Sequence, residues 1–297
     1  MEICLSFPED PNILDYVQVS KKIGTSKFSV YKVHSPTRRS DYALKVFPKT
    51  KENTAQYNKE KLIFYLNHPN IIQSIPITCH HSKFDAILTE YVSYGSFYDI
   101  VEKGVLNSDI LVRTYFHQLI EGLQHVHSRG IAHLDLKLEN LMMGPKFQLK
   151  IIDFDHAQFI KDNHLTSGGT KDYRAPEMLR GNCKDLAALD IYSAGIILFA
   201  FKAREFPFNE ENGSKPGGYD YYAKEKSSYW ELKAQQKEKG FFSENFIELV
   251  NGMVHQDVNQ RFEIKDIKES KWYKGPILNS ESLKMAIKDK IGTSASK

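Results

Sequence analysis

HLDLKLEN, residues 133–140, is the stretch that decides the fold of this chain. Two further segments follow it, IIDFD at 151–155 and GTKDYRAPE at 169–177. Asp153 lies within an apolar run, where a surface or capping aspartate is uncommon. Asp153 is therefore a candidate for a functional carboxylate.

In this order and at these separations, the three segments resemble the catalytic loop, the D-F-G and the A-P-E of the protein kinase family. The likeness extends over about residues 16–276, with DIYSAG at 190–195 and Arg261 in family-like places. The resemblance implies an α+β, bilobal fold, in which a small antiparallel β lobe with one main helix precedes a larger, mostly α-helical lobe. The sequence is most similar to serine/threonine kinases of the calcium/calmodulin-dependent and AMP-activated group.

The resemblance implies a serine/threonine protein kinase, which transfers the γ-phosphoryl group of ATP to a protein hydroxyl with the help of Mg²⁺. Such catalysis is mostly positioning and electrostatics, because charge develops on phosphate oxygens and the hydroxyl must attack in line. By family role, Asp135 orients the hydroxyl or accepts its proton, Lys137 supports the γ-phosphate, and Thr170 contacts both. Asn140 and Asp153 are the expected Mg²⁺ ligands, since Mg²⁺ prefers oxygen donors.

The resemblance also implies a nucleotide site in the small lobe. Lys45, in the A-x-K pattern at 43–45, is expected to hold the α- and β-phosphates. The gatekeeper, the hinge residues and the side chains that sandwich adenine are expected at Thr89, at Glu90 and Val92, and at Val30, Ala43 and Met142.

The glycine-rich loop of this site is altered. IGTSKFSVYKV at 23–33 resembles that loop, but only Gly24 is a glycine, and serines stand at 26 and 29. One residue is missing before Val30 relative to the family pattern. Such a loop is expected to be stiffer and to offer fewer close N–H contacts to phosphate, which predicts weak ATP binding.

Two substitutions lie near the catalytic loop, and one of them, Asp155, supports an alternative function together with the altered glycine-rich loop. Leu134 replaces the arginine of H-R-D, so activity is expected not to depend on a phosphate at Thr166 or Ser167. Asp155 replaces the glycine of D-F-G. The alternative is a kinase-fold scaffold that binds nucleotide with degraded catalysis, but no expected catalytic or metal-binding residue is lost, which favours the enzyme.

The helix expected over 52–67 leaves the partner of Lys45 open. Counting back from LNHPN without a gap places Lys59 inward, whereas Glu60 lies about 100° further round. Either Lys59 bends to solvent, or a rotated or bulged helix brings Glu60 to Lys45. The second alternative predicts a resting state with the helix displaced outward when no nucleotide or partner is bound.

The composition excludes several other classes of protein. A formal charge of +3 argues against a nucleic-acid partner, and three scattered cysteines suggest neither a disulfide framework nor a zinc site. The N-terminus lacks the pattern of a secretory signal, and the longest apolar stretch, 194–201, is too short to span a bilayer. We expect a cytoplasmic monomer, with the nucleus left open, whose partner is a protein substrate.

The sequence predicts four regions. These are an N-terminal extension at 1–15, a small lobe at 16–92, a large lobe at 93–276 and a mobile C-terminal tail at 277–297. Leu283, Ala286, Ile287 and Ile291 in the tail have the spacing of a basic amphipathic helix that could dock on the lobe or on a regulator. A solvated tail is the preferred interpretation.

Overall fold

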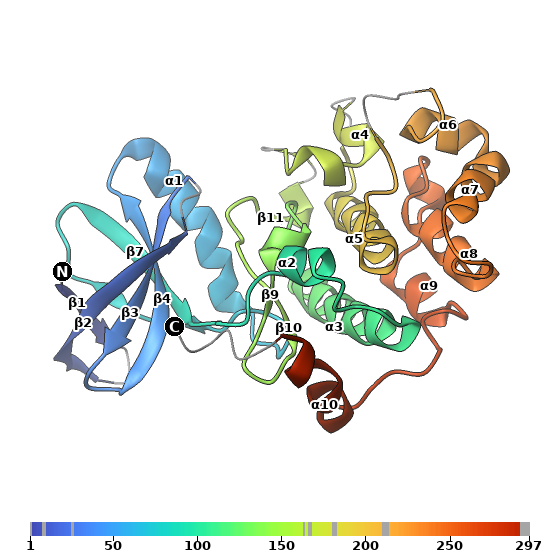
Figure 1. Cartoon of the computed structure of the whole chain (residues 1–297). Coiled ribbons are helices and arrows are strands. Elements are labelled where there is room, and N and C mark those ends of the chain that lie inside the picture. Colours follow the sequence, from blue (N-terminus) through green and yellow to red (C-terminus); the bar gives the residue numbers. More distant parts are fainter. Residues whose placement is uncertain are drawn as a thin grey trace.

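The computed structural model has two lobes joined by a short connection (Figure 1). It describes residues 2–7, 10–24, 27–162, 164–165, 168–179, 183–209 and 214–291. The first lobe is an antiparallel sheet with one main helix, and the second is mostly helical. The expected α+β, bilobal architecture is confirmed.

The small lobe contains one seven-stranded sheet in the order β5-β7-β4-β3-β2-β1-β6. Its strands are β1 Glu2–Phe7, β2 Asp10–Gly24, β3 Ser29–Ser35, β4 Ser40–Pro48, β5 Ser74–Ile75, β6 Thr78–Cys79 and β7 Phe84–Glu90. The two edge strands, β5 and β6, are separated by only two residues of chain, so the sheet curls round on itself. Helix α1, Lys51–Glu60, continues as a 3₁₀ helix over Lys61–Tyr65.

The N-terminal residues are part of this sheet, so the described part of the predicted extension at 1–15 is strand that is continuous with the small lobe. Strand β1 pairs with β2 on one side and with β6 on the other. Ile3 and Leu5 alternate inward and are buried in the same apolar cluster as Val17 and Leu44. A period of two in buried residues is what a strand with one core-facing side requires.

The large lobe is built around two long helices, α3 Asp109–Ser128 and α5 Leu186–Ala203. The other helices are α2 Phe97–Glu102, α4 Pro176–Leu179, α6 Tyr219–Lys224, α7 Lys226–Gln235, α8 Glu244–Met253, α9 Ile264–Glu269 and α10 Ser280–Ile291. Short strands β8 Ile131–Ala132, β9 Leu141–Met143, β10 Leu149–Ile151 and β11 Gln158–Phe159 form two two-stranded sheets, β9 with β10 and β8 with β11. Helix α5 is apolar and long enough to cross a membrane, but 89% of it is buried inside the protein, as expected for a core helix.

The C-terminal segment is ordered through residue 291, so the expectation of a mobile tail from 277 is wrong for its described part. Helix α10 lies beside the large lobe (Figure 1) and buries Leu283 and Ile287 in the main core. The Leu278 N–H donates to Thr114 Oγ1 at 2.9 Å, and Lys290 Nζ donates to Asn107 Oδ1 at 2.7 Å. The amphipathic alternative, a helix docked on the lobe, is the one observed.

Candidate active site

A cavity of about 360 Å³ lies where the two lobes meet. All nine residues expected to contact nucleotide line it: Gly24, Val30, Ala43, Lys45, Glu60, Thr89, Glu90, Val92 and Met142. Asp153 lines it as well. These residues come from β2, β3, β4, α1, β7, the segment after β7, and β9, so the fold gathers side chains that are far apart in sequence.

Asp135 is the centre of a hydrogen-bonded group with Lys137, Thr170 and Asn140, which we call the large-lobe wall of the site. Its Oδ1 accepts from the Thr170 N–H at 2.7 Å and from Thr170 Oγ1 at 2.8 Å, and its Oδ2 lies 2.8 Å from Lys137 Nζ. Lys137 also donates to Thr170 Oγ1 at 2.8 Å. Burial favours the neutral carboxyl, but the Lys137 and Thr170 hydrogen bonds outweigh it and hold the pKa of Asp135 below its ordinary value.

Asp190 of α5 holds the backbone of the catalytic loop by hydrogen bonds. Its two carboxylate oxygens accept the N–H groups of His133 and Leu134, each at 2.8 Å. Leu134 has a φ of 64°, a left-handed conformation that costs a branched residue about 1–3 kcal/mol. The charged hydrogen bonds from the loop to Asp190 offset this strain and fix where Asp135 lies.

Of the two expected metal ligands, Asn140 contacts Asp135, and its carbonyl oxygen accepts the N–H of Ile152, the residue before Asp153, at 2.9 Å. Asn140 Nδ2 donates to the Asp135 carbonyl oxygen at 2.9 Å and to Asp135 Oδ2 at 3.1 Å, which leaves the amide oxygen of Asn140 as the atom that can ligate a cation. Asp153 has a φ of 62° and is 23% exposed at its side chain. The donors gathered here are oxygens, which is the chemistry that Mg²⁺ prefers.

Lys45, on the small-lobe wall of the site, lies between one carboxylate from each lobe. Its Nζ is 2.7 Å from Glu60 Oε2 and 2.7 Å from Asp153 Oδ1. Burial lowers the pKa of Lys45, but Glu60, Asp153 and Asp155 together outweigh burial and raise it. Lys45 is therefore fully charged at neutral pH.

Glu60, and not Lys59, reaches Lys45 because the helix changes its winding. A 3₁₀ helix turns about 20° more per residue than an α-helix, so five residues at 61–65 add about 100°. That angle equals one α-helical residue, so a count made at α-helical pitch is wrong by one position. The paired arrangement also differs from the expected outward resting state of the helix.

Asp155, at the glycine position of D-F-G, adds another carboxylate beside Asp153. Its Oδ1 is buried and has no hydrogen-bond partner among the described residues. Burial and the charge of Asp153 raise the pKa of Asp155. Gln56 of α1 donates to the Asp155 carbonyl oxygen, which links the helix to this segment.

Other sequence expectations near the site have mixed outcomes. Leu134, at the arginine position of H-R-D, is buried in the main apolar core. Gly24 pairs with Val30 at the ends of β2 and β3, and Thr166, Ser167 and Ser26 lie outside the described residues.

Further apolar residues line the cavity and were missed in the sequence, among them Ile23, Ile72 and Ile152. Ile23 precedes Gly24, Ile152 precedes Asp153, and Ile72 follows the helix. The signal for the first two is an apolar neighbour of a predicted site residue. Ile72 carries no such signal, because only the fold brings it to the cavity.

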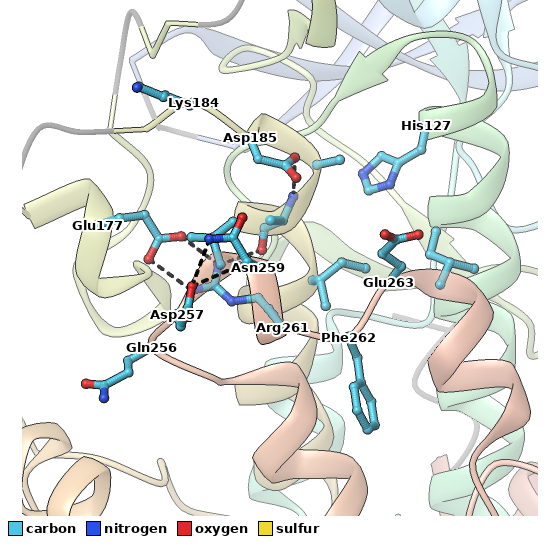
Figure 2. Close-up of a pocket in the computed structure, with 15 residues that line it drawn as sticks. His127, Glu177, Lys184, Asp185, Gln256, Asp257, Asn259, Arg261, Phe262 and Glu263 are labelled. Carbon is cyan, nitrogen blue, oxygen red and sulfur yellow. Dashed lines mark hydrogen bonds and ion pairs between the residues drawn. The ribbon is translucent and has the colours of Figure 1, made fainter.

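A buried ion pair supports the A-P-E segment. Arg261 NH1 and NH2 donate to Glu177 Oε1 and Oε2 at 2.6 and 2.9 Å, at one side of a large-lobe pocket (Figure 2). Such two-pronged pairs fix orientation as well as distance. The guanidinium also lies 5.2 Å from the ring centroid of Tyr192.

Comparison with known proteins agrees with this architecture. The protein kinase domain family matches residues 17–273. CBL-interacting protein kinase 26 of Oryza sativa subsp. japonica is 32% identical over 291 residues, covering 94% of this chain and 56% of the relative. CBL-interacting serine/threonine-protein kinase 13 of Arabidopsis thaliana is 30% identical over 278 residues, covering 90% of this chain and 53% of the relative.

The chain spans about half the length of these curated relatives. The family match nevertheless extends across both lobes and includes both walls of the site. The chain belongs to the protein kinase family, and its relatives include serine/threonine protein kinases.

Proposed function

We propose that this chain is a serine/threonine protein kinase that transfers the γ-phosphoryl group of ATP to a hydroxyl of another protein. The observation that carries the proposal is the hydrogen-bonded group of Asp135, Lys137 and Thr170. The Asp135 carboxylate lies within 4.8 Å of that of Asp155, which is two residues beyond the Asp153 that pairs with Lys45. The site thus contains both groups that the reaction needs, one that can accept the proton of the substrate hydroxyl and one that can anchor the phosphates.

In the proposed step, the substrate oxygen attacks the γ-phosphorus, and the bond from that phosphorus to the β,γ-bridging oxygen breaks. The hydroxyl proton passes to Asp135, whose lowered pKa keeps it ionised and ready to accept. ADP leaves with the electron pair of the broken bond. Lys137 neutralises charge on the moving phosphoryl group, and Lys45 anchors the remaining phosphates.

The oxygen donors of Asn140 and Asp153 fit Mg²⁺, so we assign them to hold it. When bound, Mg²⁺ supplies positive charge to the phosphate oxygens. Lys45, already paired with Asp153, keeps that carboxylate beside the phosphate end of the cavity.

A second candidate function is nucleotide binding without efficient transfer. Asp155 favours it, because a buried carboxylate beside Asp153 adds negative charge where phosphates would bind.

The names of the relatives state that they interact with CBL proteins. We propose that this chain likewise binds a regulatory protein.

The test is radiolabelled γ-phosphate transfer by the purified protein with Mg²⁺, to itself and to generic protein substrates. Transfer by the wild type that disappears in Asp135→Asn supports the kinase. ATP-dependent thermal stabilisation with no transfer by the wild type would support the binding function instead.

A further inference from the structure

A buried lysine of the large lobe contacts the hinge. Lys150, on β10, has a side chain that is 7% exposed, and its Nζ lies 2.6 Å from Glu90 Oε1. The same ammonium is 3.4 Å from the carbonyl oxygen of Ile71. Among the ion pairs of the described residues, Glu90 is the carboxylate that neutralises this buried charge.

Glu90 is the last residue of β7 and lines the nucleotide cavity. Its Oε1 accepts the Gln73 N–H at 2.8 Å, and its own N–H donates to the Gln73 carbonyl oxygen at 2.9 Å. The backbone and side chain of Glu90 are therefore both fixed to the segment just before β5. Lys150 adds the contact to the large lobe.

Strand β10 pairs with β9, the strand that supplies Met142 to the cavity floor. Lys150 pairs in register with Met142 of β9, which lines the cavity. The next residue, Ile151, donates its N–H to Asn70 at 2.8 Å and accepts from the Ile72 N–H at 2.9 Å. One short strand thus joins the floor under the adenine site to the segment that holds the hinge.

We propose that Lys150 is a positioning residue for the nucleotide. By holding the Glu90 side chain, it sets the height of the hinge backbone relative to the Met142 floor, and hence the fit of a purine ring between them. This inference rests on the proposed ATP site. It adds a residue outside the cavity lining whose effect is on nucleotide affinity and not on phosphoryl transfer.

Losing Lys150 and losing the charge of Glu90 are expected to cost different amounts of stability. Removing one member of a buried pair is costly when the other is left buried and charged. The Glu90 side chain is 26% exposed and keeps its hydrogen bond from Gln73. Losing Lys150 therefore leaves a carboxylate that is partly solvated and still hydrogen-bonded, which costs little stability. Losing the Glu90 charge leaves the Lys150 ammonium buried without a counter-charge.

The experiment compares Lys150→Met with Lys146→Met, which removes an exposed lysine from the turn before β10. Steady-state kinetics with varied ATP give KM and kcat, and thermal unfolding gives Tm. We expect Lys150→Met to raise the KM for ATP about tenfold with kcat within about twofold of wild type. Lys150→Arg should recover part of the affinity, and Lys146→Met should match wild type.

A double variant separates positioning from stability. Glu90→Gln alone should lower Tm most, and adding Lys150→Met should restore Tm while the KM for ATP stays raised. Either of two results would overturn this inference and leave the proposed function intact. One is a wild-type KM for ATP in Lys150→Met, and the other is a KM for ATP that recovers together with Tm in the double variant. A wild type that neither binds ATP nor transfers phosphate would overturn the proposed function and this inference with it.

Discussion

Asp135, on the large-lobe wall, is surrounded by donors from Lys137, Thr170 and Asn140, whereas Lys45, on the small-lobe wall, is surrounded by carboxylates. The first wall is a negative group held by hydrogen bonds. The second is a single positive charge outnumbered by acids, with Asp155 beside Asp153.

The difference separates the two tasks of the site. Groups that act on the acceptor hydroxyl are preorganised, so little rearrangement is needed when the reaction begins. Groups at the phosphate end carry surplus negative charge, which ATP must overcome with its bound cation. The departures from the family pattern described above, at Asp155 and in the glycine-rich loop, lie at this nucleotide end.

The largest effect is expected on the hydroxyl side. Asp135→Asn keeps the size of the side chain but removes the proton acceptor, so turnover should fall by about 10² to 10⁴ or more. Tm should stay near wild type, and Asp289→Asn on the exposed face of α10 is the matched control. Near-normal turnover in Asp135→Asn would show that the two walls have been assigned the wrong roles.

The next largest effect is expected at the lysine pair. Glu60→Gln removes a buried partner of Lys45, and loss of one partner from a buried pair costs up to about 3–5 kcal/mol, less here because Asp153 remains. Phosphotransfer should fall at least about tenfold, whereas Lys59→Gln should leave it nearly unchanged. Equal losses in the two variants would refute the one-residue shift in helix register.

A smaller effect, in the opposite direction, is expected for Asp155→Asn. Removing one charge a few ångströms from the phosphates should lower the KM for ATP roughly fivefold, since such a charge is worth about 1 kcal/mol in water-like surroundings. The measurement is KM for ATP at fixed protein substrate. An unchanged or higher KM would mean that the surplus charge does not oppose nucleotide binding.

The same variant has a pH signature. Because the folded-state pKa of Asp155 is raised, its carboxyl contributes stability that is present below the ordinary pKa of aspartate and is lost as pH rises through the raised value. Asparagine loses nothing over that interval. The difference in Tm between Asp155→Asn and wild type should therefore grow in favour of the variant as pH rises above the ordinary pKa of aspartate, about 4. A constant difference would contradict the shift.

The smallest effect on activity is expected far from both walls. Leu283→Ala on α10 should lower the free energy of unfolding by about 2–5 kcal/mol, because Leu283 is buried. Met285→Ala on the same helix is the control, since Met285 is 71% exposed. Turnover per folded molecule should be unchanged in both, and a loss of turnover in Leu283→Ala would show that α10 acts on the site.

The large-lobe wall was the more predictable of the two from sequence, because its residues lie in short contiguous motifs. Asp135, Lys137 and Asn140 are within one turn-like segment, and only Thr170 comes from elsewhere. The pairing of Glu60 with Lys45 was not predictable, since no residue in KLIFY, 61–65, indicates a 3₁₀ helix rather than an α-helix. The winding is decided by how Leu62 and Ile63 are buried in the core.

The ends of the chain were misjudged for a related reason. Ile3 and Leu5 alternate as in a strand, but a six-residue pattern does not reveal its pairing partners. Leu283 and Ile287 have helical spacing, but the apolar core that they join is built largely by residues far earlier in the chain. Thr114, well over a hundred positions earlier, holds the backbone of Leu278 just before the helix. Local patterns identify an amphipathic element and leave its docking to the tertiary structure.

Strand β1 has a practical consequence for anyone who shortens this protein at its N-terminus. With β1 and its partner β6 in place, each edge of the described sheet ends in a strand of two residues. Deleting residues 1–9 would expose one side of β2, a strand of 15 residues, with its N–H and C=O groups unpaired. A long exposed edge is a template for association between molecules. The shortened protein is expected to aggregate, although every residue assigned to the reaction is still present.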